Sequence, residues 1–142
     1  MRPTWDEYFL EIAKKVSERG TCDRKKVGYI LVKDKRILST GYNGSISGVP
    51  SCDDIGHLME NDHCVRSIHA EMNVLIQAAK HGIAVDGATM YGTWGPPCWP
   101  CFKMVANAGI KKIVYMESTD ERHNNSRVRE TAAVLGIELV QA

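Results

Sequence analysis

The chain has 142 residues, 44% of them hydrophobic, which is enough for the core of one domain that we place at residues 1–142. Its 18 basic and 17 acidic residues leave a net charge of +1, which argues against a dedicated nucleic-acid surface. No apolar run reaches membrane-spanning length and no signal-peptide pattern opens the chain, so we predict no membrane partner. Five cysteines, an odd number, indicate a reducing, cytoplasmic setting.

The first third of the chain predicts a helix followed by a hairpin. Thr4-Trp5-Asp6-Glu7 is a capping box that starts the helix, and Gly20 is expected to end it. Residues 27–32 and 36–40 are short β-rich runs joined by a polar turn. Residues 45–54, rich in Gly, Ser, Pro and Asp, are expected to form a long loop. The helix has apolar residues at helical spacing that are predicted to face the core: Trp5, Phe9, Ile12, Ala13 and Val16.

The rest of the chain alternates helices and strands. Strand–helix–strand repeats favour parallel pairing through right-handed crossovers. The predicted fold is therefore α/β, a mixed five-stranded sheet with an antiparallel hairpin first, parallel strands after it and helices on both faces. Helices are expected at 71–80, 98–108 and 126–135, and strands at 88–94, 112–116 and 137–140.

Two short motifs carry the chemistry, and each lies at the start of a predicted helix. Cys98 and Cys101 are three residues apart, so both sulfurs can reach one ion, and His69 adds a third ligand. Three protein ligands with an open fourth position are typical of a catalytic zinc site. A lone C-x-x-C also occurs in redox and structural zinc sites, but its combination with His69 favours a hydrolytic zinc.

Glu71 lies two residues beyond His69 and is predicted to move protons without binding the metal. Bound zinc lowers the pKa of water from 15.7 to about 7. Hydrolysis of an aromatic amidine also needs a proton on the ring nitrogen and then on the leaving amino group, and one carboxylate can supply both. The alternative is a glutamate that merely favours the helix dipole.

A second group of metal-binding side chains lies in the loop-rich first half: Cys22, Cys52, His57, His63 and Cys64. Four of these could form a closed structural zinc site that holds the long loop in place. The alternative is buried free thiols with surface histidines. We favour the second zinc.

Gly41-Tyr42-Asn43-Gly44 follows the second predicted strand, beside the expected zinc site. The segment is a turn by composition, but Asn43 there could hydrogen-bond a sugar hydroxyl. Arg24-Lys25-Lys26 is a short basic cluster that is either a solvated charge run or a phosphate-binding element.

These motifs resemble the deoxycytidylate (dCMP) deaminase family of the zinc-dependent cytidine/deoxycytidylate deaminases, across nearly the whole chain. H-x-E followed by P-C-x-x-C is shared by the wider superfamily. The Gly-Tyr-Asn-Gly loop and the Cys/His loop are similar to the dCMP branch more narrowly. The other resembling segments are Thr21-Cys22-Asp23-Arg24, Val27-Gly28, Gly56-His57, His63-Cys64-Val65-Arg66, His69-Ala70-Glu71-Met72-Asn73 and Ala108-Gly109-Ile110-Lys111-Lys112.

The resemblance implies a three-layer cytidine-deaminase-like fold that hydrolyses dCMP to dUMP and ammonia in pyrimidine deoxynucleotide metabolism. It implies a homo-oligomer, often a hexamer, that dCTP activates and dTTP inhibits. It also implies an extra zinc held by Cys22, Cys52, Cys64 and either His57 or His63. The resemblance implies that Asn43 contacts the sugar, and we add Arg24, Ala70 and Trp94 as predicted substrate contacts. The predicted effector contacts are Tyr42, Gly44, Gln77 and Lys80.

One segment departs from the family pattern. Thr93-Trp94-Gly95-Pro96-Pro97-Cys98 is one residue longer and carries a tryptophan beside the expected base pocket. A 5-methyl or 5-hydroxymethyl dCMP is therefore an alternative substrate, with Trp94 as a wall of the pocket. Three further alternatives are free cytidine, a tRNA adenosine, for which Arg127 and Arg129 give too little basic surface, and a non-catalytic zinc module that would not need Glu71.

Overall fold

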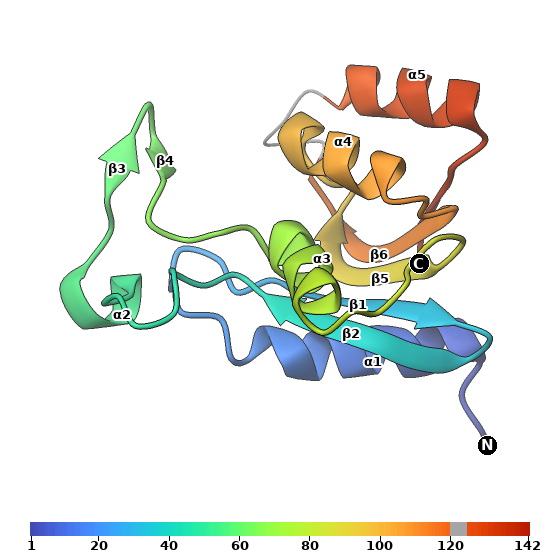
Figure 1. Ribbon diagram of the computed structural model, residues 1–142, viewed down its shortest axis with the longest axis horizontal. Helices are drawn as coiled ribbons and strands as arrows, with labels where there is room; N and C mark the ends of the chain where they lie inside the picture. Colours follow the sequence, from blue (N-terminus) through green and yellow to red (C-terminus); the bar gives the residue numbers. More distant parts are fainter. Residues whose placement is uncertain (120–124) are drawn as a thin grey trace.

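The computed structural model describes residues 1–119 and 125–142. A five-stranded sheet in the order β2-β1-β5-β6-β7 has α1 on one face and α3, α4 and α5 on the other (Figure 1). Within the described residues, no helix has both the length and the apolarity that a membrane span needs. The strands are β1 (Gly28–Lys33), β2 (Arg36–Tyr42), β5 (Thr89–Gly95), β6 (Lys112–Ser118) and β7 (Glu138–Gln141), and the helices are α1 (Trp5–Ser17), α3 (Ala70–Lys80), α4 (Trp99–Asn107) and α5 (Ser126–Leu135).

The pairing of the strands confirms the predicted mixed sheet. β1 pairs antiparallel with β2 and with β5, whereas β5, β6 and β7 run parallel. Alternate residues of β1 face opposite sides: Tyr29 and Leu31 pack under α3, α4 and α5, and Ile30 and Val32 pack against α1. A strand buried on both faces reads as a continuous apolar run, which is why this segment was recognisable.

Helix α1 begins at the predicted capping box but ends earlier than predicted. The Thr4 N–H donates to the Glu7 carboxylate at 3.0 Å, and the Glu7 N–H donates to the Thr4 hydroxyl at 3.1 Å. The helix ends at Ser17, so the prediction that Gly20 ends it was wrong. Trp5 was wrongly predicted to lie in the core and is 52% exposed. It lies in the first turn of the helix, where its ring stacks on Phe9 and meets the edge of Tyr8.

Strand β2 runs two residues further than predicted. Gly41 and Tyr42 belong to it and pair with Tyr29 and Gly28 of β1. Glycine at position 41 lets α3 lie close to the strand, since a Cβ there would overlap the Val74 backbone nitrogen and lie 2.7 Å from the Val74 Cα. Helix α3 is therefore seated directly on β2.

A small arm, residues 52–64, projects from the body of the molecule (Figure 1). It contains α2 (Cys52–Ile55) and a hairpin of β3 (Met59–Glu60) and β4 (His63–Cys64), so the prediction of a loop through residue 54 was wrong at its end. The hairpin was not predicted. Its turn residues, Asn61 and Asp62, have φ of 49° and 64°. A pair of residues that tolerate positive φ is the only local signal of this hairpin, because its strands are two residues each.

Candidate active site

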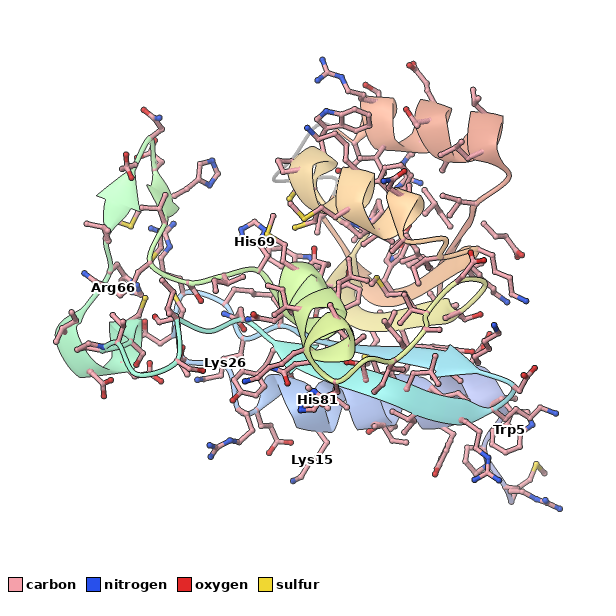
Figure 2. The ribbon with its side chains drawn as sticks, viewed as in Figure 1. Trp5, Lys15, Lys26, Arg66, His69 and His81 are labelled. Carbon is pink, nitrogen blue, oxygen red and sulfur yellow. The ribbon has the colours of Figure 1, made fainter. Side chains whose placement is uncertain are left out.

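Three metal-binding side chains meet where the N-terminal ends of α3 and α4 converge. His69 is the N-cap residue of α3 and Cys98 the N-cap residue of α4, while Cys101 lies in the first turn of α4. The His69 Nδ1 lies 3.3 Å from the Cys101 Sγ and 3.5 Å from the Cys98 Sγ, with His69 at the end of α3 that faces α4 (Figure 2). Tetrahedral zinc with ordinary Zn–N and Zn–S bonds separates such ligands by about 3.6 Å, so the donor set fits zinc.

The protonation states of the three donors depend on one another. The neighbouring Cys98 raises the pKa of His69 to about 9, and hydrogen bonding from Cys101 lowers the pKa of the Cys98 thiol to about 4. The same Cys98 raises the pKa of Cys101. One histidine and two thiols thus share protons in a space that a metal ion would fill, and metal binding at such sites displaces protons. The positive ends of both helix dipoles add to the preference for thiolates.

Glu71 lies one residue into α3 and is 8% exposed. Its side chain lines a cavity of about 450 Å³ together with His69 and Cys98. Burial raises the pKa of this carboxyl to about 7, with His69 opposing the rise and Cys98 adding to it. A carboxyl that titrates near neutrality can accept and return a proton with little free-energy cost, which is the requirement for a general acid–base group.

All four residues predicted to contact substrate line this cavity: Asn43, Arg24, Ala70 and Trp94. The Asn43 side chain also holds the chain in place, because its Oδ1 accepts from the Val27 N–H at 2.8 Å and its Nδ2 donates to the Lys25 carbonyl at 2.6 Å. Arg24 reaches across to the arm, where its Nη1 lies 3.1 Å from the Met59 sulfur.

Lys25, from the basic cluster that the sequence offered as a possible phosphate-binding element, also lines this cavity. Its Nζ lies 4.0 Å from the centre of the Trp94 ring and 3.2 Å from the Glu117 carboxylate. Trp94 lies within β5 and not in the loop after it, and its indole N–H donates to the Ser118 carbonyl at 2.9 Å. The Trp94 ring is thus held by a hydrogen bond to β6 and covered by the Lys25 ammonium at the cavity wall.

A second donor cluster joins the arm to the body. The side chains of Cys22, Cys52, His57 and Cys64 lie within 4.8 Å of one another. The Cys52 and Cys64 sulfurs are 3.4 Å apart, and the His57 Nε2 lies 2.9 Å from the Asp23 carboxylate. Four donors with a carboxylate behind the histidine are typical of a closed structural zinc site.

His63 is not part of that cluster, although it lines the cavity that contains Glu71. The reason is its neighbour in β4. Adjacent strand residues point to opposite faces, so when Cys64 faces the donor cluster, His63 must face away from it. The open choice between His57 and His63 is thereby reduced to His57.

A separate cavity of about 410 Å³ lies between β2 and α3. Tyr42, Gly44 and Gln77, three of the four residues predicted to contact effectors, line it, whereas Lys80 does not. The Asn73 side chain at its wall donates to the Tyr42 carbonyl at 2.8 Å. This cavity therefore shares helix α3 with Glu71.

A sequence model of the cytidine and deoxycytidylate deaminase zinc-binding region matches residues 3–117. The chain belongs to the cytidine and deoxycytidylate deaminase family. The matched span of this family member includes both donor clusters and Glu71, so the family predicted from the motifs is confirmed.

Two relatives of this deaminase-family chain are similar to it in sequence over most of its length. It is 47% identical over 116 residues to ComE operon protein 2 of Bacillus subtilis, covering 82% of this chain and 61% of that protein. It is 37% identical over 126 residues to the deoxycytidylate deaminase of Mycobacterium phage D29, covering 80% of this chain and 95% of that one. The chain thus spans less than two thirds of the first relative and nearly all of the second.

A solved structure agrees over the full length. The dCMP deaminase of cyanophage S-TIM5, in complex with dCMP and dUMP, matches with a TM-score of 0.83 at 31% identity and covers 100% of this chain and 99% of that one. The predicted α/β deaminase fold is confirmed by this similarity.

Proposed function

We propose that this chain is a zinc-dependent deaminase that hydrolyses dCMP to dUMP and ammonia, and that residues 1–142 act as one domain. The observation that carries the proposal is a buried carboxylate, Glu71, in a cavity beside a three-donor zinc set. A non-catalytic zinc module would not need a buried carboxylate in the same cavity as the metal donors. The dCMP deaminases named above, one of them in complex with dCMP and dUMP, support the substrate.

The protein supplies the proton transfers. His69, Cys98 and Cys101 would hold a zinc ion, which when bound supplies an acidified water with a pKa near 7. Glu71 takes the proton of that water as oxygen adds to C4 of the cytosine, and passes it to the ring nitrogen N3. It then takes the proton of the new hydroxyl at C4 and delivers it to the exocyclic amino group, so that the C4–N bond breaks, the C4 carbonyl forms and ammonia leaves. One carboxylate thus serves as base and then as acid.

The 5'-phosphate is proposed to bind where the cavity carries positive charge. Arg24 and Lys25 line it beside His63 of the arm. These cations have no use in binding a neutral nucleoside, so they favour dCMP over free cytidine. A turnover panel of dCMP, 5-methyl-dCMP, 5-hydroxymethyl-dCMP, cytidine and dCTP tests this. We expect a deoxycytidine monophosphate to give the highest kcat/KM, and an equal value for cytidine would reject the phosphate role.

The chain is expected to carry two zinc ions, one at each donor cluster. Metal analysis of protein purified without added zinc should give two per chain. Cys98→Ser and Cys52→Ser should each lose one zinc, but with different consequences. Cys98→Ser should abolish turnover, whereas Cys52→Ser should mainly raise KM, because the arm supplies cavity-lining residues such as His63.

Controls distinguish the two metal positions. A Cys52→Ser/Cys98→Ser double variant should retain no zinc if the sites are independent. Finding one zinc in the wild type, with the amount unchanged by Cys52→Ser, would show that the arm cluster binds no metal.

The second cavity is proposed as the effector site for dCTP and dTTP. Asn73 and Gln77 of α3 face it from the same helix that carries Glu71, so a ligand there can shift the catalytic helix directly. We further propose a homo-oligomer, with a hexamer as the expected size. None of the five cysteines, all of which lie in the described residues, forms a disulfide, and this supports the proposal of a reducing, cytoplasmic location.

A further inference from the structure

Tyr29 and Gly92 form an unequal pair across the antiparallel strands β1 and β5. The two residues lie directly opposite each other. Tyr29 is 0% exposed, and its ring fills the space over Gly92, where any Cβ would overlap the ring atoms. A tyrosine of this size is accommodated in the sheet only because its partner lacks a side chain.

The phenol reaches past Gly92 to the end of β5. Its hydroxyl donates a hydrogen bond to the backbone carbonyl of Trp94. A Cβ on Gly95 would lie 3.0 Å from the same hydroxyl, so the phenol also contacts the residue at which the strand ends. The buried ring thus stands at the point where the chain leaves the sheet toward Cys98.

Trp94 is held from two sides at this point. Its indole N–H donates to the Ser118 carbonyl of β6, and its carbonyl accepts from Tyr29 of β1. The indole lines the catalytic cavity, whereas Tyr29 does not. The hydrogen bond to the Trp94 carbonyl therefore links the phenol to a residue of the cavity wall.

We propose that Tyr29 is a positioning residue whose hydroxyl fixes Trp94 as a wall of the base pocket. The inference rests on the proposed function for its catalytic consequence but not for its structural one. If Tyr29 served only as core filling, a phenylalanine of the same shape would leave the Trp94 wall unchanged.

The first test needs no substrate. Trp5→Phe and Trp99→Phe leave Trp94 as the sole tryptophan, and acrylamide quenching of its fluorescence then reports how firmly the indole is held. Adding Tyr29→Phe should increase the quenching constant. Tyr91→Phe is the matched control, since it removes another phenol–protein hydrogen bond, to Asp6 at 2.7 Å, on the α1 face of the sheet. Quenching that stays unchanged in Tyr29→Phe, or rises equally in Tyr91→Phe, overturns the proposal.

The second test uses the ratio of kcat/KM for 5-methyl-dCMP to that for dCMP. Tyr29→Phe should change this ratio by about 2- to 10-fold, the effect of one hydrogen bond, and should lose that effect when Trp94 is already alanine. Tyr91→Phe should leave the ratio unaltered. An effect of Tyr29→Phe that persists in the Trp94→Ala background overturns the proposal. If neither nucleotide is turned over, the proposed function fails, and the quenching result still decides the role of Tyr29.

Discussion

Glu71→Gln is expected to lower kcat for dCMP by about 100-fold or more while zinc content stays near the wild-type value. Glutamine keeps the size of the side chain and can still hydrogen-bond, but it cannot take a proton from water or return one to the base. Glu71 is not among the metal donors, so the loss should fall on proton transfer alone. Steady-state kinetics and metal analysis of the same preparation measure the two quantities together.

Glu7→Gln is the matched control for this substitution. Glu7 also lies in the first turn of a helix, where a negative charge favours the dipole, but it is exposed and belongs to the capping box of α1. Glutamine is accepted in a capping box, so activity should not change. If Glu71→Gln retained activity to the same degree as Glu7→Gln, Glu71 would be only a helix-stabilising residue and the proton-transfer role would be rejected.

The catalytic cluster was predictable because its geometry is local. Helix starts can be recognised from short patterns, and a residue at a helix start has a known direction. The sequence therefore placed the site residues at the starts of two helices, with His69 and Glu71 at one and Cys98 and Cys101 at the other. Whether the two helix starts lie close together depends on the tertiary fold, and the alternation of helices and strands predicted that fold.

The sequence did not reveal which residues of a short strand or a helix point toward a site. The choice of His57 over His63 follows from the β3–β4 hairpin, a two-strand element too short to show alternation. Lys80 and Gln77 were predicted as effector contacts from the family resemblance. The residues of α3 and its end that line the second cavity follow a four-residue spacing, Asn73, Gln77 and His81, and Lys80 falls outside it.

Long-range pairs were also beyond a sequence pattern. Lys25 lies over Trp94 and pairs with Glu117, a residue 92 positions later, and no spacing rule connects the three. Their meeting is set by the parallel register of β5 and β6, in which Trp94 lies opposite Glu117. That register is a property of the folded sheet and has no local signal in the chain.

Trp94→Ala should raise the ratio of kcat/KM for 5-methyl-dCMP to that for dCMP by about 10- to 200-fold, the range for fitting or excluding one methyl group. The indole lines the cavity and is held by β6, so removing it opens space that a 5-substituent can occupy. Lys25 would lose the ring beneath it, and both nucleotides should then bind less tightly. Because both carry the same phosphate, that loss cancels in the ratio.

Trp5→Ala provides the control, since Trp5 is exposed on α1 and does not line the cavity. It should leave the ratio unchanged. The alternative role for Trp94 is a contact between subunits, and the two roles predict different results. An interface residue would lower kcat/KM for both nucleotides by the same factor and change the oligomer size measured by light scattering. A pocket wall changes the ratio at constant oligomer size, because a methyl group on the base can respond only to what lies beside it.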